Sequence, residues 1–382
     1  MPSRLRSILL FPIKKPRAMI KIFLELATLF SNKIVPFYNL KFPLVLTRAI
    51  HLLLSKGFVP LEALELGLLE FDFPKAELRK FVSKREMLKI ERSLNPASWE
   101  PLTEDKGIFY KYCNALSLPI PKLYAIFFSN TAGYSTKGSV LYSRKDWQTF
   151  INIELPSEFI IKPTTSAYGA GVLCYIRNQE DGFIDVASGK QYNADNIYNI
   201  MFTANKNFVI QERLINHPEL IRLSETKSLQ TLRIWTFIDR NGKSHILHAF
   251  LKVIVGENIT DNHEHGISGN LCAEVTLDKG TLKSAVKLNP NVSGIMTVVS
   301  HPKTGISFDG FNIPLWDAAL NLAKEASLKF LPMRIFGWDI AVTSNGPYII
   351  EGNIFADPPN HQKKMDLILS KVFGEQQTLL NS

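Results

Sequence analysis

The chain has few cysteines and lacks any long uninterrupted apolar run. Its three cysteines, Cys113, Cys174 and Cys272, lie far apart and form no CxxC pair. An odd, scattered set excludes a disulfide framework and a cysteine zinc site, and it is typical of a reducing compartment. No stretch of about 18 uncharged apolar residues is present, so we expect no transmembrane helix. Residues 7–13 form too short an apolar run for a signal peptide, and we therefore expect a cytoplasmic protein.

The net charge of +9 is concentrated in one segment. Residues 1–60 hold ten lysines and arginines against one acid, Glu25, whereas the remaining residues hold 34 of each sign. Because the body of the chain is neutral, its high pI does not indicate a nucleic-acid partner. The 46% hydrophobic and 21% charged content are those of a folded protein.

The first 95 residues predict a basic helical region. In residues 17–30 and 44–56, polar side chains recur at helical spacing on otherwise apolar segments. Two alternatives account for this pattern. Either the helices pack as a cap on the rest of the protein, or residues 1–60 make a peripheral contact with an anionic membrane.

Asn95-Pro96 and Pro101 mark a boundary in the chain. Beyond it, short β-branched or aromatic runs mix with helical patterns, which predicts an α+β fold. We expect a helix at residues 317–330 and strands at residues 159–162, 208–211, 231–238, 245–255, 338–342 and 348–351.

The strongest candidate site is a hairpin near the C-terminus. If its turn is centred on Asn345, Asp339 lies opposite Glu351, and Asn353 projects from the same face. Two carboxylates and an amide suit Mg²⁺ that carries nucleotide phosphates. A two-residue turn at Asn345-Gly346 would put Asp339 on the wrong face, so the metal interpretation predicts a loop with an odd number of residues. The alternative is a pair of surface acids on an edge hairpin.

A second candidate is a lysine followed by a loop of small residues. Lys162 ends a predicted strand, and Gly169 and Gly171 lie in the loop that follows it. Glycines allow backbone N–H groups to approach phosphate oxygens, and the lysine adds a positive charge. The lysine precedes the glycines, so this is no Walker A loop, and an ordinary hairpin loop is the alternative.

Two further segments carry weaker signals. A predicted strand ends in Gln211-Glu212, and Glu219 follows seven residues later, an arrangement that suits an adenine edge and a ribose. His263 and His265 have no spacing typical of metal ligands, so their segment predicts either a substrate loop or a solvated loop.

In their order along the chain, these pieces resemble the ATP-grasp superfamily and, within it, the sugar-transfer-associated ATP-grasp family. The similarity runs from about Leu94 to Asn353. It includes LTEDK at 102–106, LPIPK at 118–122, QE at 211–212, HPEL at 217–220, SLQTLRIWT at 228–236, DN at 261–262, HPKTG at 301–305, IPLW at 313–316 and the final hairpin. One departure is the loop at 164–171, which has fewer glycines than is usual and contains Tyr168.

The resemblance implies an ATP-grasp fold, in which two α+β lobes grip ATP, preceded by the basic helical region. The implied divisions are 1–95, 96–213 for the N-terminal and lid subdomains, and 214–382 for the large lobe. It also implies the roles of individual residues: Lys106 and Lys162 on phosphates, Gln211, Glu212 and Leu214 at the adenine, Glu219 on the ribose, Asp339, Glu351 and Asn353 on Mg²⁺, and Arg233 and Lys252 near the γ-phosphate or the acceptor.

The implied activity is that of an ATP- and Mg²⁺-dependent ligase. Such an enzyme activates a small-molecule or sugar carboxylate as an acyl phosphate and joins it to an amine, here in polysaccharide or glycan-precursor biosynthesis. Two alternatives stay open. One is an ATP-grasp kinase that phosphorylates a small molecule or sugar, and the other is a non-catalytic nucleotide-binding adaptor of a polysaccharide assembly complex.

Overall fold

The computed structural model describes residues 42–357 except 71–72, 79–80, 167–168, 180–181 and 290–292, together with Leu24 and Val372. The helical segments are α4 (Phe42–Lys56), α5 (Pro60–Glu65), α6 (Lys75–Leu78), α7 (Lys84–Leu94), η2 (Ala97–Trp99), α8 (Pro101–Glu104), α9 (Lys106–Ala115), α10 (Arg144–Thr149), η3 (Phe150–Glu154), α11 (Ala194–Thr203), α12 (Pro218–Ser224), η4 (Glu264–Gly266) and α13 (Trp316–Lys329). The predicted helix at 17–30 lies outside the described residues, apart from Leu24.

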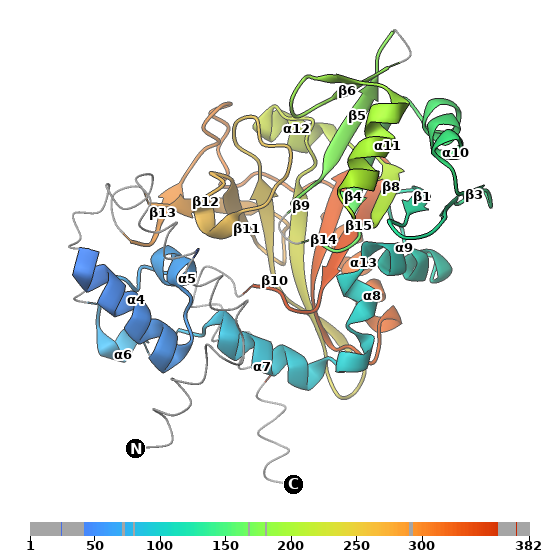
Figure 1. Ribbon diagram of the computed structural model, residues 1–382. Helices are drawn as coiled ribbons and strands as arrows, with labels where there is room; N and C mark the ends of the chain where they lie inside the picture. Colours follow the sequence, from blue (N-terminus) through green and yellow to red (C-terminus); the bar gives the residue numbers. More distant parts are fainter. Residues whose placement is uncertain are drawn as a thin grey trace.

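Two antiparallel sheets form the body of the molecule (Figure 1). The first has the order β3-β2-β1-β8-β4-β5-β6-β7, from β1 (Leu123–Phe127), β2 (Gly133–Ser135), β3 (Val140–Leu141), β4 (Glu158–Pro163), β5 (Leu173–Arg177), β6 (Phe183–Asp185), β7 (Gln191–Tyr192) and β8 (Phe208–Glu212). The second has the order β13-β12-β11-β10-β9-β14-β15, from β9 (Thr231–Ile238), β10 (Ser244–Val253), β11 (Leu271–Val275), β12 (Leu282–Leu288), β13 (Ile295–Val298), β14 (Ile335–Thr343) and β15 (Gly346–Asn353). The six predicted strands and the predicted helix at 317–330 are all confirmed within a few residues.

The seven-stranded sheet has one apolar face and one face that carries polar groups. On β9, Leu232 and Ile234 are fully buried in the core that also contains Ala323 and Ala326 of α13. Successive strand residues point to opposite faces, so Arg233 projects away from α13. The alternation along β9 therefore fixes which side of the sheet carries charge.

Helix α7 covers one end of this second face. Trp235 and Phe237 follow Arg233 at two-residue spacing, and they pack against Met87 and Leu94 of α7. In Figure 1, α7 runs below the strands from the α4–α6 group to α8. The part of the face that holds Arg233 lies beyond this apolar cover.

Helices α4 and α5 pack together at the N-terminal side. Val45, Ala49 and Leu52 form a buried stripe on α4, in one cluster with Leu64 of α5. This packing is compatible with the cap alternative for α4, and both alternatives for residues 1–60 stay predictions. Within the described part of the chain, no helix combines the length and apolar character needed to cross a membrane.

The final hairpin has the predicted pairing of its two acids but a different turn. Asp339 pairs with Glu351, as predicted. The turn, however, consists of the two residues Ser344-Asn345, so the prediction of an odd loop was wrong.

A β-bulge restores the pairing that the short turn would lose. Ile340 pairs with Ile349 while Asp339 pairs with Glu351, which leaves Ile350 as the extra residue. Since a one-residue shift exchanges the faces of a strand, the bulge places Glu351 on the side of Asp339. The carbonyl oxygen of Ile350 accepts a hydrogen bond from Tyr110 Oη at 2.9 Å.

Candidate functional site

A row of four side chains crosses the open face of the seven-stranded sheet. Phe250 on β10 pairs with Arg233 on β9, and Arg233 pairs with Asp339 on β14. Asp339 pairs in turn with Glu351 on β15. Direct cross-strand partners project from one face, so these side chains lie next to one another. All four line a cavity of about 590 Å³.

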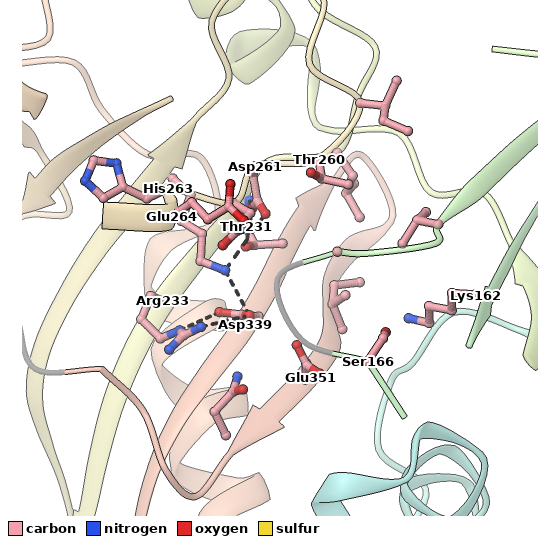
Figure 2. Close-up of a pocket in the computed structure, with 18 of the residues that line it drawn as sticks. Lys162, Ser166, Thr231, Arg233, Thr260, Asp261, His263, Glu264, Asp339 and Glu351 are labelled. Carbon is pink, nitrogen blue, oxygen red and sulfur yellow. Dashed lines mark hydrogen bonds and ion pairs between the residues drawn. The ribbon is translucent and has the colours of Figure 1, made fainter. Parts of the chain in front are cut away.

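Asp339 is held by two cations (Figure 2). Its Oδ1 accepts a hydrogen bond from Arg233 Nε at 2.6 Å, and its Oδ2 accepts one from Lys252 Nζ at 2.9 Å. Burial acts to raise the pKa of Asp339, but the charges of Arg233 and Lys252 outweigh it and lower the pKa. The floor of the cavity thus holds an ionised acid with two positive charges, which suits an anionic ligand.

Glu351 and Asn353 continue this polar patch. Glu351 Oε1 lies 3.0 Å from Lys106 Nζ, which also donates to the carbonyl oxygen of Ser166 at 3.1 Å. The side-chain amide of Asn353 donates to the carbonyl oxygen of Gly337 at 3.2 Å. That bond uses the amide nitrogen of Asn353, so its side-chain oxygen is left for a ligand in the cavity.

Lys162 projects from β4 toward the side of the cavity that holds Glu351 and Asp339 (Figure 2). Its Nζ donates to Tyr110 Oη at 2.5 Å and lies 4.8 Å from the centre of that ring. Burial, together with the charge of Lys106, lowers the pKa of Lys162 to about 7. The protonated lysine therefore lacks full compensation in the protein, and an anion in the cavity would supply it.

The two glycines of the loop after β4 have different surroundings. Gly169 lines the cavity at a φ of +69°, and a Cβ there would lie 3.0 Å from Thr260 Cγ2. Its missing side chain lets the loop approach the segment that follows β10. Gly171, with a φ of +79°, is not among the residues that line the cavity, and a Cβ there would meet Pro163 instead. Tyr168 lies outside the described residues.

The end of β8 lines the cavity next to these residues. Gln211, Glu212 and Leu214 all contribute to its wall, in the places where the resemblance puts the adenine. Gln211 is buried, and its Oε1 has no hydrogen-bond partner among the described residues. The sequence placed Glu219 here as well, and that placement needs correction. Glu219 lies in the first turn of α12, outside the cavity lining, and pairs with Arg222 at 2.7 Å.

Two residues were not selected from the sequence: Tyr110, which bonds to the cavity residue Lys162, and Glu65, which lines the cavity. Tyr110 lies four residues after Lys106 on α9, so the two share a helix face, and this spacing was an available signal. Glu65 of α5 bonds to His263, 198 residues away, and no local pattern indicates such a contact. Both loop histidines line the cavity, as the substrate-loop alternative expects.

Comparison with solved structures finds matches at low sequence identity. An N5-carboxyaminoimidazole ribonucleotide synthetase in complex with ADP is 11% identical over 74% of this chain and 52% of its own, with a TM-score of 0.39. D-alanyl-alanine synthetase A from Vibrio cholerae is 12% identical over 74% of this chain and 66% of its own, with a TM-score of 0.40. An L-amino acid ligase from Bacillus licheniformis is 11% identical over 67% and 41%, with a TM-score of 0.36. The chain thus spans less than two-thirds of each of these proteins.

No curated protein matches the chain. A family model described as sugar-transfer associated ATP-grasp, by contrast, matches residues 86–359. Because this match covers more than half of the sequence, the chain belongs to the sugar-transfer associated ATP-grasp family, and its α+β architecture is the ATP-grasp fold.

Proposed function

We propose that the protein is an ATP- and Mg²⁺-dependent ligase that activates a carboxylate and joins it to an amine. The observation that carries this proposal is the meeting of two acids with two lysines in one cavity. Asp339 and Glu351 come from the seven-stranded sheet, whereas Lys162 comes from the eight-stranded sheet and Lys106 from α9. We take residues 96–213 and 214–382 as the two lobes that grip the nucleotide.

The residues present fit both a divalent metal and a nucleotide. Asp339, Glu351 and Asn353 offer the carboxylate and amide oxygens that Mg²⁺ prefers. When bound, the metal would offset charge on the phosphates. We assign phosphate contacts to Lys106 and Lys162.

We assign the adenine to the wall formed by Gln211, Glu212 and Leu214. The unpartnered Oε1 of Gln211 is a buried acceptor, and an amino group of a base would satisfy it. The backbone of a strand end supplies further donors and acceptors in the same wall.

Arg233 and Lys252 would stabilise negative charge as it develops during the reaction. In the structure both side chains neutralise Asp339. Once Asp339 is engaged as a metal ligand, their charges become available for the γ-phosphate or for the carboxylate that attacks it. Fixed positive groups of this kind lower the barrier without reorganising during the reaction.

The reaction would proceed in two displacements. A carboxylate oxygen attacks the γ-phosphorus, the bond to the β-phosphate oxygen breaks, and ADP leaves with that electron pair. An amine then attacks the acyl carbon, phosphate leaves, and the nitrogen loses a proton. Gly169 approaches Thr260, and we assign to this contact a part in excluding water from the acyl phosphate.

The family's description directs the choice of substrate to sugars, and we propose a sugar acid as the carboxylate. The test is ADP release by the full-length protein across sugar acids and amino acids, with mass spectrometry of the product. We expect ADP release that depends on a carboxylate and an amine, and a product with an amide bond. A phosphate ester in its place would identify a kinase. No ADP release with any pair, despite nucleotide binding, would favour an adaptor.

A further inference from the structure

The wall of the cavity opposite Lys162 is built by α5 and the segment between β10 and β11. Glu62 and Glu65 come from α5, and His263 and His265 come from that segment. Figure 2 places His263 on the far side of Asp339 from Lys162. Helix α5 also precedes residue 86, where the match to the family begins. This wall is therefore separate from the residues assigned to the nucleotide, and its α5 part lies outside the residues that the family model matches.

Glu65 holds both histidine rings in place. Its Oε1 lies 3.0 Å from His263 Nε2, and its Oε2 lies 2.8 Å from His265 Nδ1. The other ring nitrogen of His263 lies 2.9 Å from the carbonyl oxygen of Asn270, which can only accept a hydrogen bond. Both nitrogens of His263 therefore face acceptors, and its ring is held as an imidazolium by Glu65 and Asn270. The side chain of Glu65 is 6% exposed, so water does not screen these bonds.

His265 differs from His263 in having one free ring nitrogen. Its Nδ1 bonds to Glu65, whereas its Nε2 has no hydrogen-bond partner among the described residues. Burial acts against the charged ring, but the bond to Glu65 raises the pKa of His265 above its usual value. His265 also lines the cavity. Its Nε2–H is thus a charged donor for which the described part of the chain provides no acceptor.

Charged side chains of both signs surround His265. Lys84 pairs with Asp357 at 3.0 Å, so these two charges offset each other. Burial raises the pKa of Glu62 to about 7, and this acid is therefore partly neutral near pH 7. Glu264, between the two histidines, is exposed and also lines the cavity, so an anion is attracted by the ring of His265 itself and not by a net positive charge of the wall.

Two aromatic side chains line the same cavity. Phe250 lies directly beside Arg233 on the sheet, and Phe355 follows the final hairpin. Apolar rings and a charged donor in one cavity suit a ligand that has both an apolar face and an anionic group, as a sugar acid has.

We propose that this wall is the acceptor subsite and that it binds a sugar acid, whose anionic group accepts a hydrogen bond from His265 Nε2. Glu65 is the positioning residue that holds His265 and His263. This inference rests on the proposed function, because only that function makes the bound sugar acid an acceptor. Binding of the sugar acid is measured separately from nucleotide binding.

The test is calorimetric titration of D-glucuronate into the full-length protein, with and without saturating Mg-ADP, and D-glucose serves as the neutral probe. We expect D-glucuronate to bind and D-glucose to bind much more weakly. His265→Gln removes the charged donor and should weaken D-glucuronate binding about tenfold, the effect of one charge-assisted hydrogen bond. Glu65→Gln should act in the same direction through His265. Both variants should keep their affinity for Mg-ADP, which also shows that they are folded.

His245→Gln is the matched control, because His245 also pairs with an acid, Asp239, but outside the cavity. It should change neither affinity. Equal binding of the two sugars, or unchanged D-glucuronate binding in His265→Gln, would overturn the inference. So would a wild-type protein that binds Mg-ADP but not D-glucuronate. Conversely, His265-dependent D-glucuronate binding without any Mg-ADP binding would support the subsite and contradict the proposed function.

Discussion

At the scale of single residues, the chemistry of the site depends on how the protein compensates Lys162. This lysine is buried, its nearest polar partner is the neutral Tyr110 Oη, and Lys106 adds a second positive charge nearby. These conditions lower its pKa to about 7. A triphosphate would stabilise the protonated form of Lys162. The surroundings that lower the pKa of this lysine in the free protein therefore favour nucleotide binding.

This lysine makes nucleotide binding dependent on pH. Phosphates favour the charged form, so the pKa of Lys162 must be higher in the complex than in the free protein. At pH 8, Mg-ATP binding should therefore take up about one proton per site, and affinity should fall as the pH rises above 7. Calorimetry in two buffers of different ionisation enthalpy measures the uptake, and Lys162→Met should abolish it. Binding heats of the wild type that are identical in both buffers would refute this assignment.

The two acids Glu351 and Glu219 were both selected from the sequence, but only Glu351 lines the cavity. Glu351→Gln should slow ADP release about a hundredfold, on the order of 3 kcal/mol in the barrier, because one metal carboxylate is lost. Glu219→Gln changes an acid paired with Arg222 at the surface and should leave the rate within about twofold. Steady-state ADP release by both variants, checked for folding by circular dichroism, compares them. Similar rates for the two would argue against the metal assignment.

At the scale of elements, the hairpin of β14 and β15 shows what a sequence can and cannot predict. The β-branched and aromatic runs predicted both strands, and an assumed turn centred on Asn345 predicted the pairing of Asp339 with Glu351. The bulge at Ile350 was not predicted, since nothing in the local sequence distinguishes it from a regular strand residue. Instead the bulge is stabilised from outside, by Tyr110 of α9. Contacts between distant elements thus determine the detail that local patterns leave open.

Packing behind this hairpin restricts Gly352. A Cβ at this position would lie 2.7 Å from Trp338 Cζ3, and the Trp338 indole is held by hydrogen bonds to Thr236 and Ser327. Gly352→Ala should therefore lower the free energy of unfolding by about 1–3 kcal/mol. Urea unfolding monitored by fluorescence measures this loss.

The control for this prediction is a smaller ring beside the new methyl group. In the double variant Trp338→Phe, Gly352→Ala, the added Cβ gains space. The loss of unfolding free energy in the double variant should therefore be smaller than the sum of the losses in the two single variants. Full stability of the single variant Gly352→Ala would contradict the packing described here.

At the scale of the whole molecule, the cavity is formed by three parts of the chain that local patterns cannot bring together. Six strands of the two sheets were predicted, but the contact of α5 with the segment after β10 was not. That contact depends on a buried acid and two histidines about 200 residues away, and periodicity contains no information about it. Sequence therefore predicted the nucleotide side of the cavity better than the opposite wall.

A ligand that bridges both sheets should stabilise the entire protein. Saturation with Mg-ATP at about 100 times its dissociation constant adds roughly 2.7 kcal/mol to the free energy of unfolding. We expect the unfolding temperature to rise with Mg-ATP and to rise less with ATP and EDTA. In Glu351→Gln, the difference in unfolding temperature between Mg-ATP and ATP with EDTA should disappear. The same shift with and without Mg²⁺ would indicate that the acids do not hold the metal.

The most direct measurement is a crystal structure of the full-length protein with Mn²⁺ and a non-hydrolysable ATP analogue, in which anomalous scattering locates the metal. The account predicts Mn²⁺ about 2.2 Å from side-chain oxygens of Asp339, Glu351 and Asn353, with the triphosphate between them and Lys106 and Lys162. Metal density away from these three residues, or an analogue bound outside the cavity, would contradict the account.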